Sequence, residues 1–485
     1  MIKKTLLVLI LLLSGCSKSV EPVEPASNSV FYEIFVGSFY DTDGDGMGDL
    51  KGVEMKLDYI QNELGAQGIW LMPIHPSPSY HKYDVLDYKA IDPKYGTMED
   101  FDSLVNEMND RGMTLILDLV LNHSSVEHPW FKASRDRDNC SDYCDYYTFS
   151  EVPVPGYHVL NNSLYYESEF TDTMPDLNLD SEGVRNEIKD ITKFWVDKGV
   201  GGFRLDATTH FYANNTEKNI DFLKWFSDYA YSLNPDLEIV GEAWAGSSIV
   251  SSMFASNISF FNFGLAQNSG SLVKSINREK GYDLAVMMAK YQASLREINP
   301  KAIDSIFFSN HDQGRSASYF ANQLEKQKLA ASIYLLLPGN AYIYYGEEIG
   351  MIGSGKDENK RLPMLWGESK GMTFGPSGSD YGGEMAMDLK SEEKDKNSLL
   401  NHYKKVTRVR NQYLEISRGE ASALDLNDPA LFAQKMGDII VVHNFSNEKK
   451  SIEGSYEIVD KTLGGTQESD TIVLEGYSSV IIKEN

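Results

Sequence analysis

The chain has 485 residues, of which 42% are hydrophobic and 12% aromatic, enough apolar material for a large packed core. This length exceeds one ordinary domain and fits one large barrel with a small additional domain. The formal net charge of −26 argues against nucleic acid and anionic membrane surfaces as partners. It suits a soluble, exposed enzyme that acts on a neutral ligand.

The N-terminal residues are expected to lie outside the fold. A basic start, MIKK, precedes the apolar stretch TLLVLILLLSG, which is too short to span a membrane as a stable helix. The stretch runs into LSGC, which resembles the lipobox of bacterial lipoproteins. That resemblance implies a signal peptide over 1–16, lipidation of Cys16, a tether over 17–28 and an extracytoplasmic place in the cell envelope. A plain secretory signal and a short buried helix are the alternatives.

The next segment, DTDGDGMGDLKG, places four aspartates among glycines directly after an apolar run. Hard carboxylate oxygens on a chain that glycine allows to turn tightly are typical of Ca²⁺ sites. The segment begins like an EF-hand loop, but Gly52 stands where that loop needs a bidentate glutamate. Because four like charges repel one another in an empty loop, the sequence favours bound Ca²⁺ over a solvated turn. The aspartates are Asp41, Asp43, Asp45 and Asp49.

Eight short apolar runs recur along the chain, separated by amphipathic or polar segments. Each run is typical of a strand buried on both faces in a parallel sheet. Helical periodicity lies between several of them: Ile188, Ile191 and Trp195 repeat at three and four residues, and Gly199 ends that helix. This rhythm predicts an α/β fold, a (β/α)8 TIM barrel over 29–123 and 181–416. The runs lie at 31–39, 68–74, 114–120, 201–207, 238–244, 259–265, 305–310 and 341–348.

Residues 124–180 interrupt the rhythm after the third strand, because they contain no long helix and are rich in Asp, Tyr, Ser and Pro. They predict a small inserted domain. Within it, Cys140 and Cys144 are expected to form a disulfide outside the cytoplasm, since no further zinc-type ligand is near. Free thiols and a metal site are the alternatives.

The last part of the chain changes from helical to strand periodicity. Apolar residues share one face of the stretch 397–416, which predicts a helix. Alternating strands and turns follow. They predict a C-terminal all-β sandwich domain over 417–485.

The carboxyl ends of the expected strands are unusually polar, and chemistry in a TIM barrel takes place at those ends. Asp206, Glu242 and Asp312 are expected to converge there with Arg204 and two histidines. Paired carboxylates suit glycoside hydrolysis, in which one attacks the sugar C1 and the other protonates the leaving oxygen. Arg204 lies on the same strand face as Asp206, and a cation there favours the ionised nucleophile.

Four of these segments resemble, in order, the main motifs of the α-amylase family of glycoside hydrolases. The segments are DLVLNH (Asp118–His123), GFRLDATTH (Gly202–His210), EIVGEAW (Glu238–Trp244) and FFSNHD (Phe307–Asp312). MPDLN, at Met174–Asn178, resembles the short motif of the family's inserted domain. The resemblance runs from about residue 29 to the C-terminus, and together with the lipobox it is similar to bacterial lipoprotein α-amylases.

The resemblance implies a role for each matching residue. Asp206 is the expected nucleophile, Glu242 the general acid/base and Asp312 the carboxylate that holds the distorted sugar in the transition state. The residues implied to bind sugar are Tyr83, which would stack on the ring, His123, Arg204, His210, His311 and the Asp357 and Arg361 pair of DENKR. A similar loop after the first strand in the family's oligo-1,6-glucosidase branch implies a structural Ca²⁺ held by Asp41, Asp43, Asp45, the Met47 carbonyl and Asp49.

Two positions need separate mention. Thr209 departs from the family's pattern, in which amylases usually have lysine, so contacts to the leaving-group sugar are not predicted. Many amylases hold another calcium between barrel and inserted domain. Asn122, Asp176 and the His210 carbonyl match that site, although Asn122 serves equally well as a hydrogen-bonding residue.

The predicted function is that of an α-amylase, which hydrolyses α-1,4 bonds in starch-like glucans and maltooligosaccharides through a covalent glycosyl-enzyme intermediate. Ala207, directly after the nucleophile, resembles the amylases. An exo-α-glucosidase or oligo-1,6-glucosidase is the alternative that the calcium loop favours, and a transferase uses the same intermediate. An inactive glucan-binding protein is disfavoured by the intact carboxylates. We expect a monomer whose only membrane contact is the lipid anchor.

Overall fold

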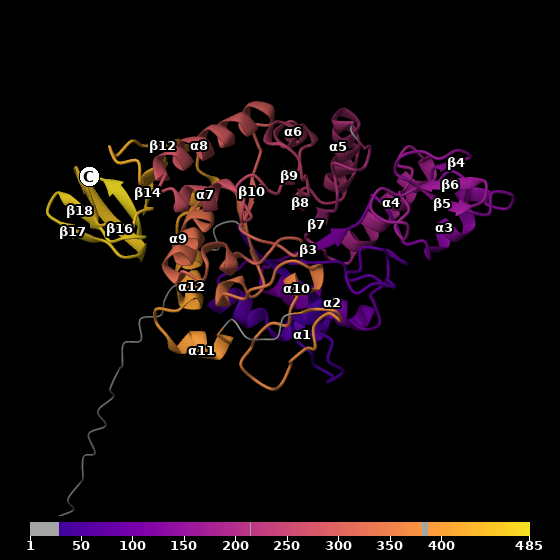
Figure 1. The fold of residues 1–485 in the computed structure, drawn as a ribbon, viewed down its shortest axis with the longest axis horizontal. Helices are drawn as coiled ribbons and strands as arrows, with labels where there is room; N and C mark the ends of the chain where they lie inside the picture. The colour runs from indigo at the N-terminus through magenta and orange to yellow at the C-terminus, as the bar shows by residue number, and fades with distance from the viewer. Residues whose placement is uncertain (1–28, 214, 381–386) are drawn as a thin grey trace, which may run out of the picture.

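The computed structural model describes residues 29–213, 215–380 and 387–485. The predictions for the signal peptide, the tether and Cys16 therefore lie outside the described residues. Within those ranges, no helix combines the length and the apolar character needed to cross a bilayer. In Figure 1, a central barrel separates a small inserted domain at one end of the long axis from a β-rich C-terminal domain at the other.

A sheet of eight strands forms the barrel, and each of the eight predicted runs contributes one strand. The strand order is β10-β11-β1-β2-β3-β7-β8-β9, with parallel pairing throughout. A single parallel bridge between Phe261 and Ser305 joins the two ends of this order. The strands are β1 (Val30–Ile34), β2 (Gly68–Leu71), β3 (Thr114–Leu119), β7 (Gly202–Leu205), β8 (Glu238–Gly241), β9 (Ser259–Phe260), β10 (Ser305–Phe307) and β11 (Asn340–Tyr344).

Helices alternate with the strands and cover the outside of the barrel (Figure 1). The helix predicted around Ile188 is α4, which begins after the capping side chain of Ser181 and stops before Gly199, whose φ is +90°. The helices of this part are α1 (Leu50–Met55), α2 (Met98–Asp110), α4 (Glu182–Asp197), α5 (Thr216–Leu233), α6 (Ser247–Met253), α7 (Ser271–Asn277), α8 (Gly281–Ile298), α9 (Leu324–Leu335), α10 (Asp357–Lys360), α11 (Leu389–Lys394), α12 (Leu399–Gln412) and α13 (Leu414–Arg418).

The barrel interior is apolar below and polar above. Because side chains alternate along a strand, residues two positions apart share the inner face. One buried cluster contains Phe31, Trp70, Ile116 and Val240, all from different strands. Two residues further along three of these strands stand Glu33, Asp118 and Glu242. The polar side chains thus lie above a buried apolar cluster, where electrostatic interactions are strong.

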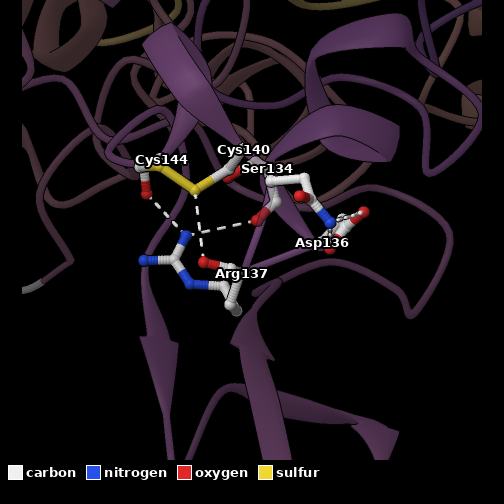
Figure 2. The surroundings of a disulfide bond; sticks show 6 residues. Ser134, Asp136, Arg137, Cys140 and Cys144 are labelled. Atoms are coloured by element: carbon white, nitrogen blue, oxygen red, sulfur yellow. Dashed lines mark hydrogen bonds between the residues drawn. A yellow bond between two sulfur atoms is a disulfide. The ribbon is translucent and has the colours of Figure 1, made fainter.

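The inserted domain is built around a three-stranded antiparallel sheet in the order β4-β6-β5. Cys140 and Cys144 form the predicted disulfide, shown in Figure 2. The Arg137 side chain donates hydrogen bonds to the carbonyls of Ser134 (3.2 Å) and Cys144 (2.6 Å), which fastens the same turn. The elements are α3 (Pro129–Ser134), the 3₁₀ helix η3 (Ser141–Tyr143), β4 (Phe149–Ser150), β5 (Tyr157–Asn161) and β6 (Leu164–Glu167).

The C-terminal part is a β-sandwich, as predicted. A five-stranded sheet, β12-β13-β14-β19-β16, packs on a three-stranded sheet, β15-β18-β17, and one apolar cluster contains residues of both. The strands are β12 (Ala421–Ala423), β13 (Leu431–Met436), β14 (Ile439–Asn444), β15 (Lys450–Glu453), β16 (Tyr456–Leu463), β17 (Thr466–Glu468), β18 (Thr471–Leu474) and β19 (Ser479–Glu484).

Candidate active site

A cavity of about 490 Å³ lies at the carboxyl ends of the barrel strands. It brings together eight of the ten residues predicted for catalysis and sugar binding. The remaining two, Arg204 and His311, are buried beneath it, with side-chain exposures of 1% and 0%. The lining residues from the prediction are Asp206, Glu242, Asp312, Tyr83, His123, His210, Asp357 and Arg361.

Arg204 is the buried cation that holds the carboxylates together. Its Nη1 donates to Oδ1 of Asp206 (2.7 Å) and to Oδ1 of Asp118 (2.9 Å), and its Nη2 donates to Oε2 of Glu242 (2.7 Å). The guanidinium lies 5.3 Å from the Trp70 ring in the floor of the barrel. The structure therefore differs from the sequence expectation, because Arg204 contacts the carboxylates and not the cavity where a sugar binds.

Burial dominates the ionisation of these carboxyl groups. It raises the pKa of both Asp206 and Glu242, and the charge of Arg204 offsets only part of that effect. Arg204 favours the ionised form of Asp206, as expected from the sequence, but burial outweighs it. Burial likewise raises the pKa of Asp118 to about 7. A raised pKa suits a group that must deliver a proton, which is the task expected of Glu242.

Asp312 is ionised by its neighbours. Its Oδ2 lies 2.9 Å from Nε2 of His311, and Nδ1 of that ring lies 2.6 Å from Oε1 of Glu33. Burial disfavours the charged ring, but the carboxylates of Asp312 and Glu33 outweigh it and raise the pKa of His311 to about 9. Burial also opposes ionisation of Asp312, yet His311 and Arg361 hold the pKa of Asp312 well below its usual range.

Asp357 and Arg361, the pair expected to bind the next sugar, both line the cavity but have different partners. Arg361 donates from Nη2 to Oδ1 of Asp312 (2.9 Å) and from Nη1 to the hydroxyl of Tyr80 (2.9 Å). Asp357 instead accepts a hydrogen bond from Lys360 (2.7 Å). Both line the cavity, but Arg361 is already engaged with a carboxylate of the site.

Three further predicted residues present aromatic or imidazole groups to the cavity. The Nε2 atom of His123 has no hydrogen-bond partner among the described residues, and burial lowers the pKa of His123 to about 4. The Tyr83 ring stacks on His311 at 5.7 Å, and its hydroxyl donates to Oδ2 of Asp118 (3.0 Å). His210 lies at the rim, 3.0 Å from the Glu169 carboxylate. A neutral His123 can exchange hydrogen bonds with a sugar hydroxyl.

Several lining residues were not singled out from the sequence. Trp244 is 50% exposed and stacks on Phe263 at 4.8 Å. His81 accepts a hydrogen bond at Nδ1 from the Tyr83 N–H (3.1 Å). Each stands two residues from a predicted site residue, in the loop that follows a barrel strand, so nearness in sequence was the available signal. The others are Phe170, Thr171 and Met174, from the inserted domain.

The loop predicted to bind Ca²⁺ lies away from this cavity. One carboxylate oxygen each from Asp41, Asp43 and Asp49 lies within 4.8 Å of the others, a donor set that fits a hard divalent cation. Asp45 is not part of that cluster, and its carboxylate accepts a hydrogen bond from the Met47 N–H (2.7 Å). The residues therefore fit the ion through three of the four predicted carboxylates.

The second calcium position has a different arrangement. The side-chain amide of Asn122 donates to Oδ1 of Asp176 (3.1 Å), and burial raises the pKa of Asp176 to about 7. The Glu169 N–H donates to the other oxygen of Asp176 (3.0 Å). In this structure, Asn122 is the hydrogen-bonding residue that the sequence left open as an alternative.

Comparison with known proteins agrees with this geometry. A family model described as "Alpha amylase, catalytic domain" matches residues 33–419. Alpha-amylase 3 of Dictyoglomus thermophilum is 40% identical over 499 residues, which cover 99% of this chain and 98% of that protein. Probable oligo-1,6-glucosidase 2 of Bacillus subtilis is 31% identical over 516 residues, covering 87% and 91%.

A solved structure extends the comparison to the fold. Amy13B of Eubacterium rectale superposes with a TM-score of 0.90 at 40% identity, covering 95% of this chain and 97% of that one. The family-model match, residues 33–419, includes Asp206, Glu242 and Asp312. The chain therefore belongs to the α-amylase family of glycoside hydrolases and is an enzyme of that family.

Proposed function

We propose that this enzyme is an α-amylase that cleaves α-1,4 bonds in starch-like glucans and maltooligosaccharides with retention of configuration. The observation that carries the reaction type is the Arg204 guanidinium, which donates to Asp206 and to Glu242 at 2.7 Å each. Two carboxylates on one guanidinium are close neighbours. This closeness favours the distance of about 5–5.5 Å between the two catalytic carboxyl groups of retaining glycosidases over the roughly 6.5–9.5 Å of inverting ones.

In the proposed mechanism, Asp206 attacks C1 of the sugar and forms a covalent glycosyl-enzyme. Glu242 gives its proton to the leaving oxygen and then removes one from the attacking water. Asp312 is ionised between His311 and Arg361 and accepts hydrogen bonds from sugar hydroxyls. These hydrogen bonds become stronger as the sugar ring distorts toward the transition state. His123, which lines the same cavity, is the candidate partner of another hydroxyl.

The bond preference rests on two supports. Alpha-amylase 3 of Dictyoglomus thermophilum is similar over almost the whole chain, and Ala207 lines the cavity directly after Asp206, as in the amylases. A second candidate is an exo-α-glucosidase or oligo-1,6-glucosidase, which the similarity to the Bacillus subtilis protein of that name supports.

The deciding experiment uses a soluble form that begins after Cys16, with Ca²⁺ present. It is incubated with soluble starch and, separately, with isomaltose, and the products are separated by size over time. We expect an early spread of short maltooligosaccharides and intact isomaltose. Glucose as the sole early product, or cleaved isomaltose, contradicts the amylase proposal and supports the second candidate.

We also propose that the enzyme is a monomer, that Ca²⁺ is structural, and that lipid on Cys16 anchors the protein outside the cytoplasm. The lipobox-like sequence before Cys16 supports the anchor, and the convergence of Asp41, Asp43 and Asp49 supports the ion. For the anchor, Cys16→Ser is expected to move the protein from the membrane fraction to the soluble fraction. Retention of that variant in the membrane fraction contradicts it.

A further inference from the structure

Glu33 is a buried carboxylate with no role in the proposed reaction. It is one of five residues of β1, VFYEI, and is 1% exposed. It does not line the cavity. Its Oε1 accepts from the His311 ring at 2.6 Å and lies 3.4 Å from the His311 backbone nitrogen. Because burial of a carboxylate without a partner is costly, this contact explains why Glu33 is tolerated inside the barrel.

The other ring nitrogen of His311 also faces acceptors. Nε2 lies 2.9 Å from Oδ2 of Asp312 and 2.7 Å from the hydroxyl of Tyr83. That hydroxyl uses its own hydrogen on Oδ2 of Asp118 at 3.0 Å, so toward His311 it accepts. Ionised carboxylates only accept hydrogen bonds. The contacts of both ring nitrogens are therefore satisfied together when His311 carries two N–H groups.

We propose that Glu33 is a positioning residue of the active centre, which keeps His311 doubly protonated and fixed in orientation so that the imidazolium holds Asp312 ionised. The resulting hydrogen-bond chain links Glu33 of β1 to His311 and His311 to Asp312 at the cavity. Glu33 thus acts on the sugar only through two other side chains.

The surrounding charges make this contribution measurable. The ionisable groups that face or influence Glu33 and His311 come from every strand packed around them, and among them Arg204 is a cation that disfavours a second positive charge nearby. Removal of Glu33 leaves His311 with one carboxylate in contact, that of Asp312. The ionisable groups around Glu33 and His311 are Tyr83 after β2, Asp118 on β3, Arg204 on β7, Asp206 after β7, Asp312 after β10 and Tyr344 on β11.

A rival arrangement places the proton on Glu33 and leaves His311 neutral. Burial raises the pKa of Glu33, which is the direction that this arrangement requires. The two arrangements differ in the charge of His311 near neutral pH. A direct titration of that ring therefore decides between them.

The first experiment titrates the histidine ring signals by NMR in protein labelled at its nine histidines, with His311 assigned from the spectrum of His311→Gln. In the wild type, His311 is expected to titrate well above pH 7, and in Glu33→Gln at least about one pH unit lower. The matched control is Glu238→Gln, a half-buried glutamate of β8 that accepts from Asn340 at 2.7 Å. That control is expected to leave the His311 titration unchanged. A neutral His311 in the wild type at pH 7, or an unchanged titration in Glu33→Gln, overturns the proposal.

The second experiment measures kcat and KM on a maltooligosaccharide, and this arm alone rests on the proposed function. Partners that orient an active-site group typically contribute about 10–100-fold. We expect kcat of Glu33→Gln to fall by that factor with KM changed by less than about 3-fold, and Glu238→Gln to match the wild type. Equal losses in the two variants indicate a general cost of neutralising a glutamate of a barrel strand and overturn the proposal. If the wild type hydrolyses no α-glucan, the proposed function fails while the titration still tests Glu33.

Glu33→Asp covers the case in which Glu33→Gln does not fold, as judged by circular dichroism. It keeps the charge but shortens the side chain, which lengthens the 2.6 Å contact. We expect His311 to keep a pKa above 7 while kcat falls. Wild-type kcat in Glu33→Asp overturns the positioning role.

Discussion

Arg361 and Asp357 lie at opposite ends of one helical turn, yet they have different partners. Arg361 donates to Asp312 and is 3% exposed, whereas Asp357 is 59% exposed and pairs with Lys360. A hydrogen bond between charged groups contributes about 1.5–3 kcal/mol. We therefore expect Arg361→Lys to lower kcat by about 10–100-fold, and Asp357→Asn to change mainly KM. Steady-state kinetics on maltoheptaose checks this, and a pure KM effect in Arg361→Lys contradicts it.

The ionisation of Glu242 predicts the alkaline limb of activity. Burial, followed by the negative charges of Asp206 and Asp312, raises the pKa of Glu242 against the opposing charge of Arg204. The acid form is lost as pH rises through that raised pKa, so kcat/KM for a maltooligosaccharide should fall there. With α-maltosyl fluoride, whose leaving group needs no proton, the alkaline limb should weaken or disappear. Identical limbs for both substrates contradict the assignment of Glu242 as the acid.

Individual residues show where sequence reasoning stops. Asp206, Glu242 and Asp312 could be predicted because they follow apolar runs and match known motifs. The role of Glu33 could not be predicted, because the residue lies within the apolar run of β1 and its role depends on contact with His311, 278 positions away. The partner of Arg361 could not be predicted either, since the sequence does not show whether its side chain lies closer to Asp312 or to Asp357. Periodicity specifies the face of a strand and not the partner across a barrel.

At the scale of elements, the Asp41–Gly52 loop offers a matched pair of exposed aspartates. Asp43 belongs to the three-carboxylate cluster, and Asp45 does not. Because an ion that binds only the folded protein stabilises it, Ca²⁺ in excess over EDTA should raise Tm of the wild type. Asp43→Asn should abolish most of that increase, and Asp45→Asn should keep most of it. Calorimetry of the three proteins with Ca²⁺ and with EDTA decides, and equal losses in both variants contradict the observed cluster.

The elements themselves were largely predictable, but their lengths were not. Each of the eight apolar runs overlaps a barrel strand, and α4 and α12 follow the predicted periodicity. The run at 259–265 yields only Ser259–Phe260 as strand, since the chain leaves the sheet although Phe261 and Phe263 remain in the core. Hydrophobicity reports burial, and burial continues where pairing has ended.

At the scale of the whole molecule, buried histidines make the free energy of unfolding depend on pH. His443 of β14 and His402 of α12 are buried, and burial lowers the pKa of each to about 3. In the unfolded chain a histidine binds its proton near pH 6.5. Below that pH the unfolded state binds more protons than the folded state. Each such histidine therefore costs about 1.4 kcal/mol of stability per pH unit down to its folded pKa.

Buried carboxyl groups act in the opposite sense. Burial raises the pKa of Asp304 and of Glu347 to about 7, so between about pH 7 and 4 the folded state binds their protons first and gains stability as pH falls. The comparison must therefore be between proteins that differ at one group. The free energy of unfolding of His443→Gln, measured by urea at pH 7, 6 and 5, should rise relative to that of the wild type as pH falls below 6.5, by about 1.4 kcal/mol per unit. Parallel curves contradict a neutral His443 in the folded state.

The single bridge between Phe261 and Ser305 is the point where the barrel is expected to open locally. Neighbouring strands elsewhere in the barrel pair over two to four positions, whereas here the Asn262 N–H donates one bond to the Ser305 carbonyl (2.9 Å). The amide proton of Asn262 should therefore exchange with solvent sooner than those shared by β1 and β2. Glu242 precedes this seam and Asp312 follows it, so a glucan held by both carboxylates spans the seam. The proposed glucan substrate, bound across this junction, should therefore slow that exchange and stabilise the barrel where its pairing is weakest.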